Sequence, residues 1–361
     1  MKIFGQASLY DLFQENIIYR NLDIIDIRYP KFYEIKNQLH IQDLPRKNSK
    51  DYASVVLSIL RSINPDVDSV LYFGDSQLDI ALVQNIFEIQ DIEVRGFIYS
   101  SHEYKDLPVY YYKSWEKIFD FITCCKKLIG QNTIAVFDLD KTIIGAKGRN
   151  ESVINDVRFD AVYEQLKNLE NSISRDSAKR IYDILQLNHA DYTQDNQDTT
   201  ALLTILIAHR IIDFDKLDEF KKGNVKLTDL TSLAMLDCDN DLLKKLTAEI
   251  QKKLSKRSPT FFIPFRESEF KATIARFNRY PKEKGVEFIV NNEITITKEI
   301  CDAVHFLNNN SVTCVCLSDK PDEAVFPASS ANGKKQEKPL HLKQAKIVGN
   351  EIESNLKKLT S

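Results

Sequence analysis

The sequence lacks several features that would assign the chain to a class at once. No apolar run approaches the roughly 18 residues that a membrane-spanning helix needs. Residues 1–20 contain no charged stretch followed by an uninterrupted apolar stretch, which excludes an ordinary secretory signal. The formal net charge is −3, so no basic excess indicates a nucleic-acid partner.

Cysteine and histidine are also scarce and poorly placed for metal chemistry. The chain has six residues of each type, and no pair has convincing metal-ligand spacing. Cys314 and Cys316 lie two apart in an apolar run, which on a strand puts them on one face as buried thiols. We therefore expect a cytoplasmic protein, or one secreted into a host cell by a signal that is not visible in the sequence.

The composition is that of a folded protein, with 43% hydrophobic and 28% charged residues among 361. Strand and helix patterns alternate along the first 149 residues, and alternation resumes after residue 285. Such alternation predicts an α/β fold, a doubly wound and mostly parallel sheet with helices on both faces. Strands are predicted in residues 21–27, 69–75, 92–100, 108–112, 131–140, 311–319 and 345–349.

Strand patterns disappear between residues 150 and 285, where amphipathic helical stretches dominate. This block has the size of an ordinary domain. We therefore predict three segments: the first part of the α/β core in 1–149, an inserted helical domain in 150–285, and the second part of the core in 286–361.

Acidic residues follow two of the predicted strands. Asp138 and Asp140 end one apolar strand, with Thr142 after them, and Asp75 and Asp79 follow another. The carboxyl ends of parallel strands meet at the edge where doubly wound sheets bind ligands. Together these carboxylates would supply the oxygen-rich site that Mg²⁺ prefers. Each strand end taken alone is equally explained by a turn and a helix cap.

A third strand ends at Ser318, and the three strand ends together resemble the haloacid dehalogenase superfamily in its phosphatase branch. The resembling pieces are DLDKT at 138–142, LSDKP at 317–321 and GDSQLD at 74–79. The resemblance covers roughly 40–145 and 285–350. It implies a Rossmann-like core and an aspartyl-phosphate intermediate.

The resemblance also implies roles for single residues. Asp138 would be the nucleophile, Asp140 the general acid and base, and Ser318 a phosphoryl ligand. Mg²⁺ would be held by Asp138, the carbonyl of Asp140 and Asp75, with Asp79 behind the metal.

Two further phosphate contacts are expected, from Thr142 and from a lysine. Lys50 heads a predicted helix and is the first choice for the lysine, with Lys47 next. Lys338 is the alternative if the motif order after Ser318 is unbroken.

The motif order departs from that of the family, because the GD motif at 74 precedes the nucleophile at 138. Reading the chain as a circle restores the order, so we predict a circular permutation joined through residues 113–131. The strand that ends at Gly74 should then lie beside the strand that ends at Asp138.

In this family, an insertion between the nucleophile and serine motifs is a cap that closes over the site. Basic residues gather late in the inserted block, at Arg266, Lys271, Arg276 and Arg279. Arg266 and Lys271 are candidates to bind a second anionic group of the substrate. A solvated helix face is the simpler explanation for each of them.

The sequence thus predicts a Mg²⁺-dependent phosphatase for a phosphorylated small molecule or phosphoprotein. The composition and the large unmatched insertion look similar to secreted effector phosphatases of intracellular bacteria, which often act on phosphotyrosine or other host phosphates. Two alternatives stay open: a phosphomutase, and a catalytically silent binding module that keeps the fold.

Overall fold

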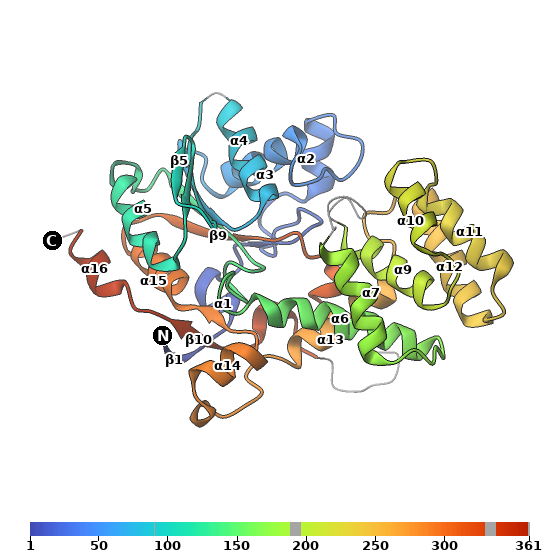
Figure 1. The fold of residues 1–361 in the computed structure, drawn as a ribbon. Helices are drawn as coiled ribbons and strands as arrows, with labels where there is room; N and C mark the ends of the chain where they lie inside the picture. Colours follow the sequence, from blue (N-terminus) through green and yellow to red (C-terminus); the bar gives the residue numbers. More distant parts are fainter. Residues whose placement is uncertain (90, 188–195, 329–336, 360–361) are drawn as a thin grey trace. The chain divides into compact units, whose positions relative to one another are not determined.

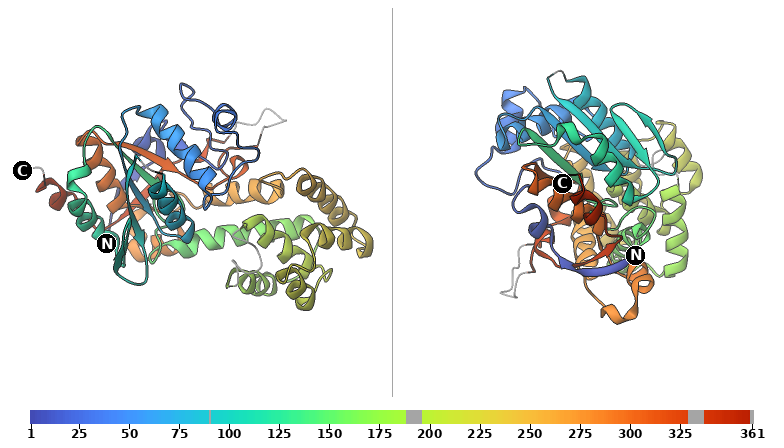
Figure 2. Two further views of the ribbon diagram at one scale, coloured as in Figure 1. Left: turned by 90° about the horizontal axis from the view of Figure 1, so that it is seen from above. Right: turned by 90° about the vertical axis from the view of Figure 1, so that its left-hand side faces the viewer.

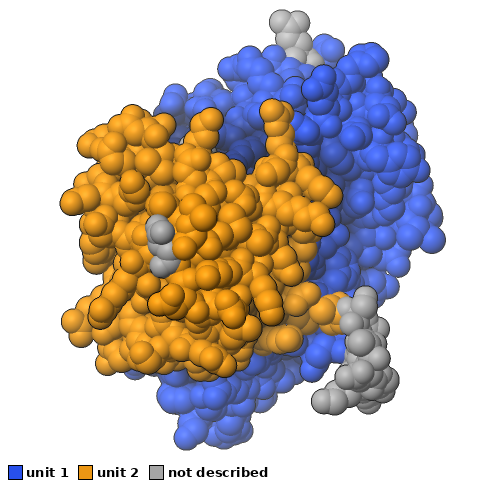
Figure 3. All heavy atoms as spheres, turned by 90° about the vertical axis from the view of Figure 1, so that its right-hand side faces the viewer, with its two compact units in different colours: residues 1–154, 274–326, 337–361 blue, residues 155–273, 327–336 orange. Residues whose placement is uncertain are grey.

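The computed structural model describes residues 1–89, 91–187, 196–328 and 337–359. The chain divides into two compact units, coloured separately in Figure 3. The α/β unit comprises residues 1–154, 274–326 and 337–361, and the helical unit comprises residues 155–273 and 327–336. No helix among the described residues is both long and apolar enough to cross a membrane.

The α/β unit is built on a seven-stranded sheet with the order β2-β9-β7-β3-β4-β6-β5. Neighbouring strands are parallel throughout, except that β5 pairs antiparallel with β6. The predicted α/β class with a mostly parallel sheet is confirmed (Figure 1). The strands are β2 (Ile17–Ile18), β3 (Ser69–Gly74), β4 (Glu93–Tyr99), β5 (Tyr104–Asp106), β6 (Val109–Tyr112), β7 (Thr133–Asp138) and β9 (Thr313–Leu317).

Successive residues of the central strands face opposite sides of the sheet, and both sides are apolar. Val70 and Tyr72 of β3 belong to one buried cluster, which includes the apolar residues of α3 (Lys50–Ile63) and α4 (Gln77–Glu88). On the other face, the ring of Phe73 stacks on Phe137 of β7 with centroids 4.4 Å apart and meets Phe121 edge-on. The uninterrupted apolar runs in the sequence therefore form strands that are packed against apolar side chains on both faces of the sheet.

A second, three-stranded sheet has the order β1-β10-β8, with bounds β1 (Lys2–Ala7), β10 (Ala345–Gly349) and β8 (Ile296–Thr297). The first and last strands of the chain, β1 and β10, pair antiparallel, from Lys2 opposite Gly349 to Ala7 opposite Ala345. Figures 1 and 2 show these two strands side by side. The strand predicted at 345–349 is thus present, but in this separate sheet.

The other helices of the α/β unit are short or cover the sheet. They are α1 (Leu9–Phe13), α2 (Phe32–Gln38), α5 (Ile118–Cys124), α14 (Val286–Asn292), α15 (Lys298–Asn309) and α16 (Glu353–Lys357). Helix α14 begins at Val286, where the sequence analysis placed the return to the α/β core. It belongs to the α/β unit, in which Ile289 and Val290 pack against Val348 of β10.

The helical unit encloses its own apolar core and is made of helices throughout its described residues. Two helices, α6 (Glu151–Asn168) and α13 (Ile263–Ile274), carry the chain into and out of this unit. Between them run α7 (Arg175–Leu187), α9 (Gln197–Ala208), α10 (Phe214–Lys221), α11 (Leu227–Asp237) and α12 (Asp241–Ser255).

Two predicted elements differ from the structure. Residues 21–27 form no strand, because the Asp26 carboxylate accepts hydrogen bonds from the main chain and side chain of Arg28 and turns the chain there. The joining segment 113–131 contains only a short α-helix, α5, which is flanked by single 3₁₀ turns at Trp115–Lys117 and Lys126–Leu128.

Candidate active site

The three strands that carry the predicted motifs are neighbours. Strand β7 pairs in parallel with β3 on one side and β9 on the other, with Phe137 opposite Phe73 and Asp138 opposite Leu317. The predicted adjacency of the strands that end at Gly74 and Asp138 is confirmed. Asp75 and Ser318, which follow those neighbours, therefore flank Asp138 at the carboxyl edge of the sheet.

Three aspartates meet at this edge. Asp75, Asp79 and Asp138 are all buried, and each offers a carboxylate oxygen within 4.8 Å of the others. Together with Lys47, described next, they are called the strand-end cluster below. Oxygen ligands at such spacing suit a hard divalent cation.

Asp79 has a structural task within the cluster. Its Oδ2 accepts hydrogen bonds from the main-chain N–H groups of Asp75 (3.1 Å) and Ser76 (2.9 Å), and its Oδ1 accepts from the Tyr72 hydroxyl (2.6 Å). A side chain at position 74 would stand 2.6 Å from Cγ of Asp79, which explains the glycine there. Asp79 thus fixes the turn that presents Asp75.

Lys47 supplies the positive charge of the cluster. Its Nζ lies 2.6 Å from Oδ1 of Asp138 and 2.6 Å from Oδ1 of Asp79, and the side chain is 3% exposed. Lys47 stands in the turn just before α3, from which its side chain reaches Asp138 and Asp79.

The first-choice lysine of the sequence analysis is corrected. Lys50 is the first residue of α3, and its side chain is 73% exposed and paired with Glu88. It points away because the buried face of α3 is formed by apolar residues such as Tyr52 and Val55. Lys338 is exposed as well. Of the three candidate lysines, Lys47, the second choice, is therefore the one whose side chain reaches Asp138.

Ser318 and Asp140 are linked by a residue that the sequence analysis missed. Ser318 is buried, and its Oγ accepts a hydrogen bond of 3.1 Å from the main-chain N–H of Lys320. The Lys320 ammonium lies 3.1 Å from Oδ2 of Asp140, and its side chain is 5% exposed. The available signal was a lysine two residues after the strand end, in the quoted LSDKP motif.

The loop after β7 is tightly held. Lys141 adopts a left-handed backbone conformation (φ 64°), and the Ile144 N–H returns to the carbonyl of Leu139 at 3.0 Å. Thr142 is fully buried, and its carbonyl accepts the Thr297 hydroxyl at 2.6 Å. The main-chain carbonyl of Thr142 thus anchors this loop, and the phosphate contact expected from Thr142 stays a prediction.

A second missed lysine, Lys147, approaches the cluster from the same loop. Its Nζ donates to the main-chain carbonyl of Asp75 and lies 3.3 Å from Oδ2 of that aspartate. The side chain is about one-third exposed. Sequence reasoning could not place it, because its reach depends on how the loop folds back.

The electrostatics of the strand-end cluster follow from burial and crowding. Burial and the neighbouring Asp79 raise the pKa of Asp138 well above its ordinary value, against the opposing effect of Lys47. Burial and Asp79 also raise the pKa of Asp75, from 3.8 to about 6. For Asp79, burial is outweighed by Lys47 and the hydrogen-bond donors, so its pKa is lowered. The cluster thus sets three buried carboxylates against one ammonium, and burial makes it unfavourable for all three carboxylates to be ionised.

The basic residues noted late in the inserted block are divided between the two units. Arg266 is buried in the helical unit, where it pairs with Asp198 (2.5 Å) and Glu269 (2.7 Å). Lys271 is exposed, and Arg276 and Arg279 lie outside the helical unit. The proposed substrate role of Arg266 is therefore wrong, because its charge is already satisfied inside the core.

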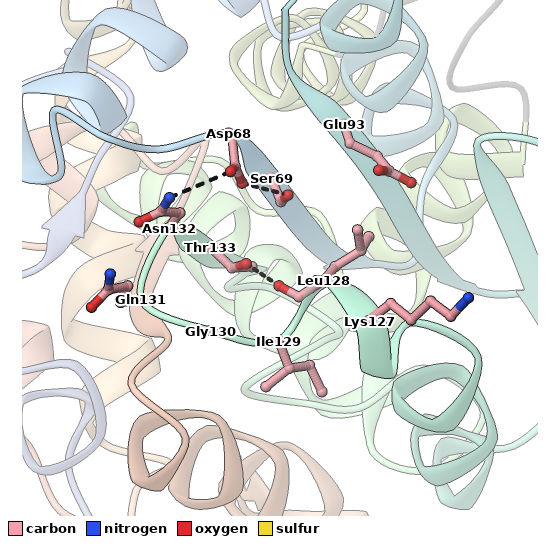
Figure 4. A pocket seen from close by; sticks show the side chains of 10 residues that line it. All are labelled: Asp68, Ser69, Glu93, Lys127, Leu128, Ile129, Gly130, Gln131, Asn132 and Thr133. Atoms are coloured by element: carbon pink, nitrogen blue, oxygen red, sulfur yellow. Dashed lines mark hydrogen bonds between the residues drawn. The ribbon is translucent and has the colours of Figure 1, made fainter.

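A shallow cavity of about 570 Å³ lies at the opposite edge of the sheet (Figure 4). Its lining includes Ser69, Glu93 and Thr133, the first residues of β3, β4 and β7. The acidic motifs stand at the other ends of these strands, so this cavity is separate from the candidate site.

Comparison with protein-family models, with curated proteins and with solved structures finds no match for this chain. Function is therefore inferred below from the geometry of the strand ends.

Proposed function

We propose that the protein is a Mg²⁺-dependent phosphatase of the haloacid dehalogenase type that works through an aspartyl phosphate on Asp138. One observation carries the proposal: buried Lys47 bridges Asp138, at the end of β7, and Asp79, in the first turn of the helix that follows the adjacent strand β3, with Asp75 and Ser318 on either side of Asp138. Turns and helix caps explain the acidic residues one at a time. They do not explain a buried lysine shared by Asp138 and Asp79.

The roles of the chain's residues follow from their places. A carboxylate oxygen of Asp138 attacks phosphorus, and the bond to the leaving oxygen breaks while Asp140 gives that oxygen a proton. Lys47 and the Ser318 hydroxyl hold the oxygens of the transferred phosphoryl group. Asp140 then takes a proton from a water molecule that attacks the phosphoryl group, which releases phosphate and restores Asp138.

The residues present fit a magnesium ion. The donors are all oxygens, and three buried carboxylates stand against the single ammonium of Lys47, so a divalent cation would offset the charge that burial disfavours. Asp75, Asp138 and the main-chain carbonyl of Asp140 would hold the ion, while Asp79, whose oxygens already accept several hydrogen bonds, orients the turn. When bound, Mg²⁺ would neutralise charge on the phosphoryl group.

The circular permutation and the cap belong to the same proposal. The antiparallel pairing of β1 with β10 brings the first and last strands together, as the circular motif order requires. The chain leaves the α/β unit at residue 154, after Asp138, and returns at residue 274, before Ser318. We assign the helical unit between these points the role of a substrate-selecting cap.

Two lysines three residues apart provide a matched test. We expect Lys47→Met to lower turnover of p-nitrophenyl phosphate by at least about a hundredfold, because the phosphoryl charge loses its buried partner. Lys50→Met removes the same charge from the surface and should leave turnover within about twofold of wild type. Turnover would be measured with Mg²⁺ and with EDTA. Equal effects of the two substitutions, or full wild-type activity in EDTA, would reject the proposal.

A further inference from the structure

The proposed mechanism leaves one buried cation near the reacting groups without a role. Lys320 lies in the turn after β9, is 5% exposed, and places its ammonium 3.1 Å from Oδ2 of Asp140. A buried ammonium is costly unless it is paired. Lys320 pairs here with Asp140, the carboxylate that the proposed mechanism uses to transfer a proton.

The main chain of Lys320 is pinned independently of its side chain. Its N–H donates to Ser318 Oγ at 3.1 Å, and its carbonyl accepts the N–H of Arg20 at 3.0 Å. The N–H of Ser318 in turn donates to the carbonyl of Ile18 at 2.9 Å, which ties the turn to the end of β2. The Cα of Lys320 is therefore held in place, which limits the positions that its ammonium group can reach.

We propose that Lys320 is a positioning residue that holds the Asp140 carboxyl group where the leaving oxygen departs. This inference rests on the proposed phosphatase function, since it assigns Lys320 a part in that reaction. The ion pair restrains the carboxyl group from one side, and Ser318 receives its own orientation from the same residue's N–H. One residue thus aligns the proton donor with the phosphoryl ligand.

The consequence is a dependence on the leaving group. When the P–O bond breaks, its electron pair remains on the leaving oxygen, and the proton from Asp140 neutralises it. An acidic phenol such as p-nitrophenol can leave as the anion without that proton, whereas the less acidic phenol depends on receiving it. Loss of Lys320 should therefore slow the hydrolysis of phenyl phosphate more than the hydrolysis of p-nitrophenyl phosphate.

The test measures kcat and KM for a series of substituted phenyl phosphates with wild type, Lys320→Met, Asp140→Asn and the double variant. We expect Lys320→Met to lower kcat about tenfold or more for phenyl phosphate and less than about threefold for p-nitrophenyl phosphate. The inhibition constant of inorganic phosphate should stay within about twofold, because the N–H to Ser318 remains. In the Asp140→Asn background, Lys320→Met should cost nothing further. Lys320→Arg should recover part of the loss.

The outcomes separate this inference from the function on which it rests. Wild-type protein that hydrolyses none of the esters with Mg²⁺ rejects the proposed function and the inference together. Active wild type with an equal loss on every ester, or with an additional loss in the Asp140→Asn background, rejects the inference alone. If Lys320→Met lacks the cooperative melt of wild type, Lys320→Gln replaces it, with the same expected leaving-group dependence.

Discussion

Each unit of the molecule buries a cluster of charged side chains, and the two clusters differ in their balance. In the helical unit, Arg266 pairs with Asp198 and Glu269, and Arg158 lies 3.7 Å from the same glutamate. Asp198 also accepts hydrogen bonds from the main-chain N–H groups of Phe261 and Phe262, which directly precede α13. Two carboxylates face two guanidinium groups, and the cluster is complete as it stands.

In the α/β unit, three carboxylates meet beside one buried ammonium, that of Lys47, which contacts Asp79 and Asp138 but not Asp75. Lys147 adds a contact to Asp75 only from a partly exposed position. Burial and the neighbouring Asp79 raise the pKa values of Asp75 and Asp138, so full ionisation of this cluster is unfavourable without a further cation. The contrast indicates that a balanced buried cluster is a structural part of the core, whereas an unbalanced one is suited to a cation supplied from solution.

The largest effect should come from the centre of the unbalanced cluster. We expect Asp138→Asn to lower phosphatase turnover by at least about a thousandfold, because an amide does not attack phosphorus. The variant should fold, since the substitution removes a crowded buried charge. Circular dichroism and turnover measured on the same samples separate the two effects. Turnover of even a tenth of the wild-type value would exclude Asp138 as the nucleophile.

The balanced cluster should respond in the opposite way. We expect Arg266→Met to cost about 3–5 kcal/mol in the free energy of unfolding, because it leaves Asp198 and Glu269 buried without their partner. Turnover per folded molecule should change little. Lys271→Met, on the same helix but exposed, is the control and should shift stability by less than about 0.5 kcal/mol. A stable Arg266→Met variant that has lost activity would show that Arg266 has a functional role and not a structural one.

Asp75 offers a test in which loss of function accompanies a gain of stability. Its pKa is about 6 in the fold against 3.8 ordinarily, so the metal-free protein should lose stability as the pH rises through about 6. The difference corresponds to roughly 3 kcal/mol. Asp75→Asn should remove this loss in EDTA and raise the melting temperature at pH 8, while abolishing Mg²⁺ binding. Unchanged Mg²⁺ affinity by calorimetry would exclude Asp75 as a ligand.

The smallest effect concerns Lys147, whose ammonium stands where it competes for Asp75. We expect Lys147→Met to tighten Mg²⁺ binding by roughly fivefold, about 1 kcal/mol, because a partly solvated opposing charge is removed. Isothermal titration calorimetry would measure this directly. Lys50→Met, which removes an exposed lysine paired with Glu88, is the control. Weaker binding in Lys147→Met would show that this lysine supports the metal site.

The sequence predicted the parts of this site that depend on strand ends. The apolar runs before Asp75, Asp138 and Ser318 were long enough to identify buried strands, and parallel strands bring their carboxyl ends to one edge. Their neighbourhood in the sheet was inferred from the motif order and agrees with the pairing of β3, β7 and β9.

The parts that failed depend on side-chain direction. Lys47 and Lys50 are both plausible from the sequence, and only the start of α3 at Lys50 decides that one side chain turns inward and the other outward. Arg266 looked like a solvent-facing cation because its partner Asp198 is 68 residues away. Contacts between such distant segments have no local signal in the sequence.

The pairing of β1 with β10 has a mechanical consequence. Because Lys2 stands opposite Gly349 and the strands are antiparallel, both ends of the pair leave the sheet on the same side. A force applied between the chain's two ends would break the hydrogen bonds between β1 and β10 one after another, starting at Lys2 and Gly349, and would not load all of them at once. The three-stranded sheet should therefore yield at low force, and the seven-stranded sheet with its strand-end cluster should rupture later as a separate event.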